Sequence, residues 1–127
     1  MKVLIIDDED DVRGVFAEAF RIFGYEVCEA ANGSVGIKTF DQEGPDIVVV
    51  DVFMPEKDGI ETLLEIRMRN EQVPIIAMSG GGHGQHFQFL DMTRKLGANR
   101  LLKKPILPKD LVTAASECLA GKGRDGS

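Results

Sequence analysis

The composition of this 127-residue chain, with 43% hydrophobic and 28% charged residues, fits a single soluble globular domain. The net charge of −6 argues against a nucleic-acid-binding surface, which needs a basic patch to meet phosphates. No apolar run approaches the roughly 18 residues of a membrane span, and no signal peptide precedes the first strand, so we expect a cytoplasmic protein.

The first half of the chain alternates between short apolar runs and helical patterns. Strands are predicted over residues 2–7, 25–30 and 46–51, and helices over 10–23 and 34–42. Asp10 is the predicted N-cap of the first helix. Apolar residues at helical spacing predict a stripe of that helix that faces the core: Val12, Val15, Phe16, Ala19, Phe20 and Phe23.

The second half continues this alternation. Strands are predicted over residues 74–79 and 99–103, and helices over 59–70, 86–96 and 108–119. Residues 1–120 are expected to form one domain, and the small, polar residues 121–127 a flexible tail. Cys28 and Cys118 are too few for a disulfide framework and are expected to be reduced and at least partly buried.

Five successive β–α units predict an α/β fold with a parallel sheet covered by helices on both faces. Right-handed crossovers make such a sheet doubly wound. The common strand order of a five-stranded sheet is 2-1-3-4-5, the flavodoxin-like (βα)5 arrangement. This order places the first and third strands side by side, and ligands bind outside the carboxyl ends of the strands at that point.

Three aspartates follow or end the two central strands of this predicted sheet. Asp7 and Asp8 come directly after the first strand, and Asp51 ends the third. Two carboxylates about 5 Å apart repel by roughly 3 kcal/mol at an effective dielectric of about 20, so a cation is expected to compensate. Mg²⁺ fits best, because it takes hard oxygen ligands and needs fewer protein oxygens than Ca²⁺. The remaining acids of the stretch are assigned to the turn and the helix start: Glu9, Asp10 and Asp11.

A hydroxyl and an ammonium are expected at the same edge of the sheet. Ser79 ends the fourth strand, and a lysine ends the fifth. Lys103 and Lys104 are adjacent, so they point in opposite directions and only one can enter the site; their spacing does not choose between them. A metal, an ammonium, a hydroxyl and a carboxylate nucleophile are the groups needed to transfer a phosphoryl group onto an aspartate.

The ordered motifs resemble those of the receiver domain of bacterial two-component response regulators, of the chemotaxis type. Each motif is weak alone, but the ordered set is specific and covers about residues 2–119. The matching features are Asp7-Asp8, Asp51 within Asp-Val-Phe-Met-Pro, Asp58-Gly59, Ser79, Gly97-Ala98 and Lys104-Pro105.

The resemblance implies a metal site that holds Mg²⁺. Asp8 would be a direct ligand and Asp7 an outer partner through water. Asp51 and the backbone carbonyl of Phe53 would complete the ligands from the protein. As the bulky residue two positions after Asp51, Phe53 is also expected to restrict attacking water and slow hydrolysis of an aspartyl phosphate.

The resemblance also implies the roles in phosphoryl transfer. Asp51 would be the phosphoacceptor, Lys104 the phosphate-binding lysine before a cis proline, and Ser79 a hydrogen-bond donor to the phosphoryl group. A sensor histidine kinase or a histidine phosphotransfer protein would donate the phosphoryl group. The chain would act as a switch that changes its partner-binding face, as a monomer or weak dimer, without turning over an external substrate.

Two features depart from the family pattern. Leu101 stands where the family usually has an aromatic residue, so the aromatic part of the usual switch is absent. Four glycines surround His83 after Ser79, which predicts a mobile loop or a flexible connection. His83 and His86 are expected to be exposed loop residues, and one of Phe87 and Phe89 to be exposed for a partner.

Rival functions are weighed on the same residues. A phosphatase of the haloacid dehalogenase type needs an acid two residues after its nucleophile, where this chain has Phe53. An interaction module that works without phosphorylation would lack an acidic residue or the lysine, and this chain has them all. We expect a stand-alone receiver, with a receiver fragment of a longer response regulator as the alternative.

Overall fold

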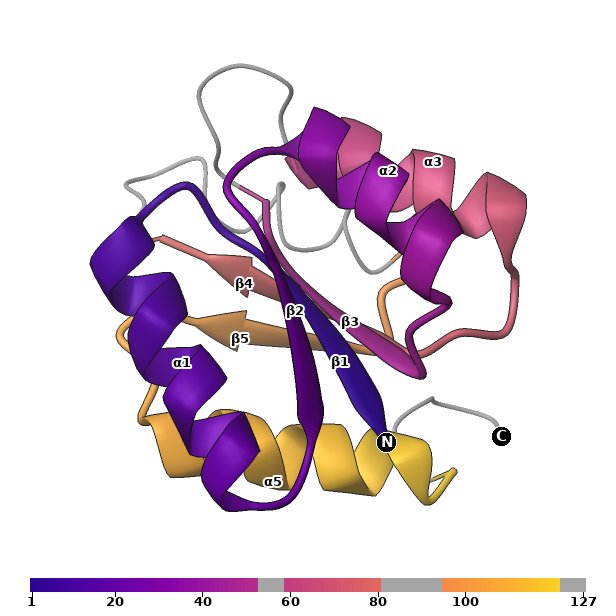
Figure 1. Ribbon diagram of the computed structural model, residues 1–127. Coiled ribbons are helices and arrows are strands. Elements are labelled where there is room, and N and C mark those ends of the chain that lie inside the picture. The colour runs from indigo at the N-terminus through magenta and orange to yellow at the C-terminus, as the bar shows by residue number, and fades with distance from the viewer. Residues whose placement is uncertain (53–58, 81–94, 122–127) are drawn as a thin grey trace.

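The computed structural model describes residues 1–52, 59–80 and 95–121, which form a central parallel sheet between two layers of helices (Figure 1). The strands are β1 (Lys2–Ile6), β2 (Glu26–Ala30), β3 (Ile47–Asp51), β4 (Ile75–Ser79) and β5 (Arg100–Lys103). The helices are α1 (Asp10–Ile22), α2 (Gly33–Glu43), α3 (Gly59–Arg69) and α5 (Pro108–Leu119). The predicted helix at 86–96 lies outside the described residues except for its last two positions, as do the loop histidines and both nearby phenylalanines: His83, His86, Phe87 and Phe89.

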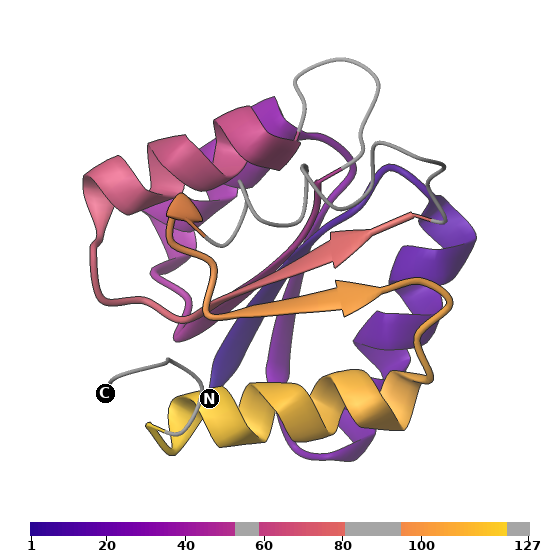
Figure 2. The ribbon, with the colours of Figure 1, turned by 180° about the vertical axis from the view of Figure 1, so that it is seen from behind.

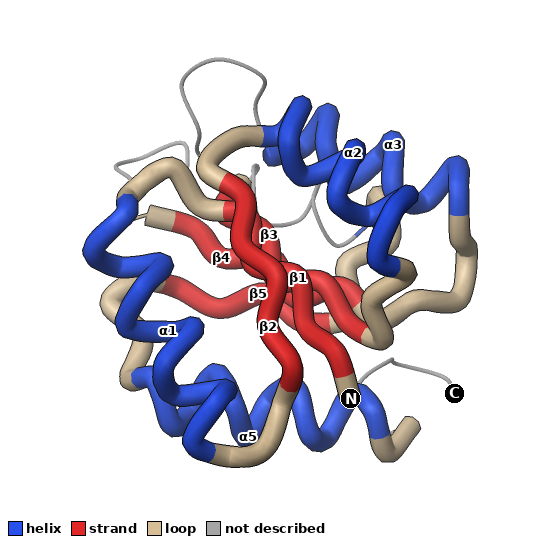
Figure 3. The backbone as a smooth tube through the Cα atoms, in the orientation of Figure 1, coloured by secondary structure: helices blue, strands red, loops and turns tan. Residues whose placement is uncertain are grey.

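The strands follow the order β2-β1-β3-β4-β5, and every neighbouring pair is parallel. Figure 3 shows the strands gathered at the centre of the molecule with the helices outside them. The predicted fold class and strand order are therefore confirmed. β1 and β3 are neighbours, with Ile6 beside Val50, so the segments that follow them leave the sheet at the same edge. That edge is the switch point where the sequence places its aspartates.

Alternate residues of each central strand enter two separate cores, because successive side chains of a strand point to opposite faces. Figures 1 and 2 show α2 and α3 on one face of the sheet and α1 and α5 on the other. The first core joins Leu4, Ile6, Val48 and Val50 to Phe40 and Leu63, among others. The second joins Val3, Ile5, Val49 and Met78 to Phe16, Phe20 and Leu111, among others.

Helix α1 differs from the prediction in two details. Its N-cap is Glu9, whose side chain makes no capping hydrogen bond, and Asp10 is already inside the first turn. Phe16 and Phe20 are buried as predicted, but the predicted core residues Val15 and Phe23 are 55% and 61% exposed. The core takes Ala17 instead. The stripe that fits the sheet is narrower than the apolar stripe of the sequence, so its flanking members remain at the surface.

Both cysteines are free thiols, as predicted; Cys28 is half-buried and Cys118 is buried. Burial raises the pKa of the Cys118 thiol, because it disfavours the charged thiolate. Among the helices in the described part of the chain, none has the length and apolar character that a membrane crossing requires.

Candidate functional site

Three carboxylates converge where β1 and β3 end. Asp7 follows β1, with its backbone N–H donating to the Ala30 carbonyl at 3.1 Å, and Asp51 is the last residue of β3. Asp7 and Asp51 are buried, whereas Asp8 is exposed. One carboxylate oxygen from each of the three residues lies within 4.8 Å of the others. The parallel register of two neighbouring strands thus produces the predicted cluster.

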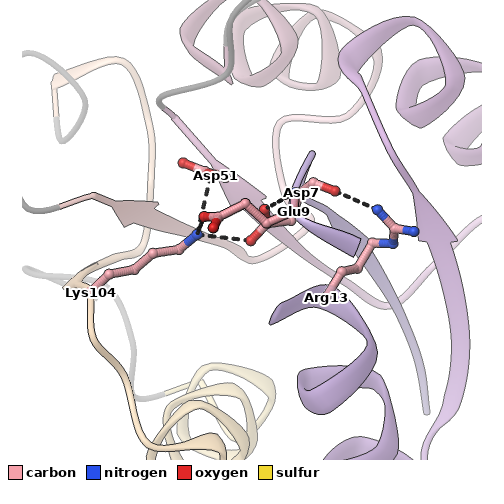
Figure 4. Close-up of polar contacts among 5 residues, drawn as sticks. All are labelled: Asp7, Glu9, Arg13, Asp51 and Lys104. Atoms are coloured by element: carbon pink, nitrogen blue, oxygen red, sulfur yellow. Dashed lines mark hydrogen bonds and ion pairs between the residues drawn. The ribbon is translucent and has the colours of Figure 1, made fainter. Parts of the chain in front are cut away.

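A lysine ammonium contacts two members of this cluster (Figure 4). The Lys104 Nζ donates to Asp7 Oδ2 at 3.0 Å, to Asp51 Oδ2 at 3.2 Å and to Glu9 Oε1 at 3.3 Å. Lys103 is exposed, so Lys104 is the one of the two adjacent lysines that enters the site. Burial opposes the charge on Lys104, but hydrogen bonds and charge attraction from Asp7 and Asp51 outweigh it and raise the pKa of Lys104 above its ordinary value.

The backbone holds Lys104 in this position. Its N–H donates to the Ser79 carbonyl at 2.8 Å, which continues the β4–β5 ladder by one residue. The following bond, Lys104–Pro105, is cis, as the resemblance implies. Ser79, which carries a hydroxyl, and Lys104, which carries an ammonium, therefore lie side by side at the ends of β4 and β5.

The charges of the site do not balance among the described residues. Asp7 and Asp51 share one ammonium, from Lys104, which also contacts Glu9, and Asp8 adds a third carboxylate to the cluster. Arg13 is close, but it donates to the backbone carbonyl of Asp7 at 2.7 Å and pairs with other acids: Asp10 and Glu29. The remaining negative charge and the hard oxygen atoms fit a small divalent cation such as Mg²⁺.

Ser79 is fully buried, and its Oγ has no hydrogen-bond partner within the described chain. A buried hydroxyl without a partner costs about 1–3 kcal/mol. Such a cost at the end of β4, next to Lys104, suits a donor whose acceptor is supplied by a ligand.

Gly59 supports the site from the start of α3. A Cβ at this position would overlap the backbone carbonyl oxygen of Asp51 and the Cα of Val52. Only a residue without a side chain lets α3 begin this close to the end of β3. This close packing against the backbone explains why the Asp58-Gly59 motif has a glycine at position 59.

One residue of the site was not predicted from the sequence, and one predicted residue lies outside the part of the chain that the structure describes. Glu9, assigned from sequence to the turn, contacts Lys104; its position next to Asp7-Asp8 was a signal, but a local pattern does not show a contact with a residue far along the chain. Phe53, predicted to supply a carbonyl ligand and to restrict water, lies outside the described residues.

A family comparison decides the class of protein to which this site belongs. The family model of the response regulator receiver domain matches residues 3–116. The chain belongs to this family. Receiver domains are signalling switches, phosphorylation and Mg²⁺ are typical of the family, and response regulators receive phosphoryl groups from histidine kinases.

Curated relatives of this receiver domain are longer regulators. The chain is 37% identical over 111 residues to "Probable transcriptional regulator ycf27" of Guillardia theta, covering 87% of this chain and 42% of that protein. It is 41% identical over 78 residues to "Regulatory protein AtoC" of Escherichia coli, covering 61% of this chain and 17% of that protein. The chain thus spans less than half the length of these relatives.

Solved receiver structures have the same fold. A response regulator receiver domain protein from Clostridium thermocellum superposes with a TM-score of 0.86 and 29% identity, over 95% of both chains. The receiver domain of NtrX from Brucella abortus gives a TM-score of 0.84 and 25% identity, over 93% of this chain and 98% of that chain.

Proposed function

We propose that this receiver domain is a phosphoryl-accepting switch in which Asp51 takes the phosphoryl group from a phosphohistidine. The donor is a sensor histidine kinase or a histidine phosphotransfer protein. The observation that carries the proposal is the Lys104 ammonium, which bridges Asp51 and Asp7 inside a cluster with excess negative charge. An acceptor carboxylate beside a fixed cation is the arrangement that phosphoryl transfer needs.

Each residue has a defined part in the transfer. An Oδ atom of Asp51 forms a bond to phosphorus while the bond between phosphorus and the donor's imidazole nitrogen breaks, and the nitrogen keeps the electron pair. Lys104 stabilises the charge on the phosphoryl oxygens, and the Ser79 hydroxyl donates a hydrogen bond to one of them. Asp8 and Asp51, with Asp7 through water, would hold Mg²⁺, and the ion would supply further positive charge beside the phosphoryl group.

A surface groove next to Lys104 supports docking of a donor protein at the start of α1. Its volume is about 600 Å³, and its lining includes Val12, Val15 and Phe16 of α1 and Pro105 and Ile106 after β5. Because Lys104 also lines it, a histidine on a partner seated here would lie close to the acceptor. A Val15→Asp variant should slow transfer from a phosphorylated histidine phosphotransfer domain but not from acetyl phosphate.

We propose that the phosphorylated state acts on a second protein through the surface around β5 and α5. Leu101 of β5 is half-buried and packs against the core on the α2–α3 face, so it fills space there without an aromatic ring. A stand-alone receiver is the form we favour. The length of relatives such as AtoC makes a receiver attached to an output domain the alternative.

The direct test is uptake of radiolabelled phosphate from acetyl phosphate with Mg²⁺. We expect one label per chain, removal of uptake by EDTA, and complete loss in Asp51→Asn. Asp41→Asn is the matched control, because Asp41 is an exposed acid that pairs with Arg69 on a different surface. Absence of label in the wild-type protein would favour an interaction module, and multiple turnovers of a generic phosphate ester would favour a phosphatase.

A further inference from the structure

Glu9 is an additional carboxylate partner of Lys104 that the phosphoryl-transfer chemistry does not use. Its Oε1 lies 3.3 Å from the Lys104 Nζ, and its backbone N–H donates to Asp7 Oδ1 at 2.9 Å (Figure 4). The Glu9 side chain is 60% exposed and forms no capping bond with α1. The backbone of Glu9 is thus tied to the buried cluster, while its carboxylate lies at the solvent side of the ammonium.

The Lys104 ammonium contacts two of the carboxylates that form the proposed metal site. It binds one Oδ atom of Asp7 and one of Asp51, and these two residues belong to the cluster that could hold an ion. Two cations at the same carboxylates repel each other. The protein therefore has to weaken the contacts of Lys104 with Asp7 and Asp51 when a divalent cation binds.

Among the described acids of this segment, Glu9 differs from its neighbours. Asp10 pairs with Arg13 at 2.8 Å. Asp11 is exposed and lines the same groove, but no contact joins it to Lys104. Glu9 combines an anchored backbone with a carboxylate that already touches the ammonium.

We propose that Glu9 is a positioning residue that retains the Lys104 ammonium at the rim of the site when Mg²⁺ binds. The exposed carboxylate gives the ammonium an anionic partner as its contacts with Asp7 and Asp51 weaken. Lys104 then stays within reach of an incoming phosphoryl group and does not turn into solvent. The inference rests on the proposed function, because it requires Mg²⁺ at the aspartate cluster.

The test is a double-mutant cycle on Mg²⁺ affinity in the full chain at constant ionic strength. The chain contains no tryptophan, so isothermal titration calorimetry and amide NMR shifts are the suitable readouts. The proteins are the wild type, Glu9→Gln, Lys104→Met and the double variant. Asp11→Asn is the matched control, since it removes one exposed charge from the same turn.

We expect Glu9→Gln to weaken Mg²⁺ binding about tenfold, and Asp11→Asn to weaken it by about twofold through distance-dependent charge alone. Lys104→Met should strengthen binding, because it removes the competing cation. In the Lys104→Met background the effect of Glu9→Gln should fall to about twofold, equal to that of Asp11→Asn.

An equal effect of Glu9→Gln with and without Lys104 would overturn the proposal, as would an effect no larger than that of Asp11→Asn, or weaker binding in Lys104→Met. Each of these results would leave the phosphoacceptor role of Asp51 intact. A wild-type protein that does not bind Mg²⁺ would instead remove the proposed metal site, and the role of Glu9 with it.

Discussion

The carboxyl and amino ends of the parallel sheet differ in how their charged side chains are paired. At the carboxyl end, Asp7, Asp51 and Ser79 are buried, and Lys104 is the ammonium that the carboxylates share. At the amino ends of β4 and β5, the Arg67 guanidinium binds several segments of the chain. Arg67 donates to the carbonyl oxygens of Gly97, Val73 and Asn70 and to Asn99 Oδ1.

The two ends also differ in whether their polar groups already have hydrogen-bond partners and opposite charges. Asn99 Oδ1 also accepts from the Ile75 N–H at 2.9 Å, so the Arg67 cluster joins the end of α3 to the starts of β4 and β5 with neutral acceptors. At the carboxyl end, carboxylates outnumber cations and the Ser79 hydroxyl lacks a partner within the described residues. The hydrogen bonds of the Arg67 cluster need no ligand, whereas the carboxyl end of the sheet is stabilised when a ligand binds.

Gly59→Ala is expected to have the largest effect, and it tests the rigidity of the carboxyl end. The added methyl overlaps the Asp51 carbonyl and the Val52 Cα, so backbone must move; we expect a loss of about 3 kcal/mol of unfolding free energy and weaker Mg²⁺ binding. Gly14→Ala is the control, because its Cβ meets nothing within 4 Å and alanine favours helix by about 1 kcal/mol. Urea unfolding with and without Mg²⁺ measures both variants; equal stability of the two would contradict the packing argument.

Arg67→Ala tests the amino end. Removal of the guanidinium leaves several part-buried acceptors unpaired, and we expect a loss of about 2 kcal/mol with Mg²⁺ affinity unchanged. Arg69→Ala is the control, since Arg69 forms an exposed pair with Asp41 that is worth at most about 1 kcal/mol. If Arg67→Ala changed metal affinity as much as stability, the two ends would not be independent.

Asp8→Asn should separate stability from function at the carboxyl end. It removes one of three neighbouring carboxylates, so the metal-free protein should gain about 0.5–1 kcal/mol, while the stabilisation by Mg²⁺ should disappear. Thermal unfolding with EDTA and with Mg²⁺ gives both numbers. A metal-free Asp8→Asn protein less stable than the wild type would show that the contacts of Asp8 stabilise the fold more than its charge repulsion destabilises it.

The smallest expected effect is at alkaline pH. Because the pKa of Lys104 is raised above its ordinary value of 10.5, its pairing stabilises the fold fully below that pH. This contribution is lost as the pH rises through the higher pKa of the folded state. The stability difference between the wild type and Lys104→Met should therefore shrink above pH 10.5; a constant difference up to denaturation would mean that Lys104 acts by packing alone.

The sequence predicted the elements because their signals are local. Five apolar runs gave five strands with ends within one residue of those observed, and the helix α3 was expected at 59–70 and is found at Gly59–Arg69. The faces of α1 were less predictable. Val15 and Phe23 satisfy the helical period but remain exposed, because the curvature and width of the sheet decide how much of a stripe is covered.

The amino-acid sequence by itself determined the β–α units and the places of Asp7, Asp8 and Asp51 at the ends of strands, since both follow from local patterns. The strand order was expected because it is the common one for such a sheet, and the strand pairing in the tertiary structure confirms it and brings the three aspartates together. Only the tertiary structure decided which of two adjacent lysines enters the site and that Glu9 meets it there. Both contacts join residues more than ninety positions apart, and they depend on how the segment after β5 turns towards α1. Such side-chain geometry follows from packing and charge in the assembled fold.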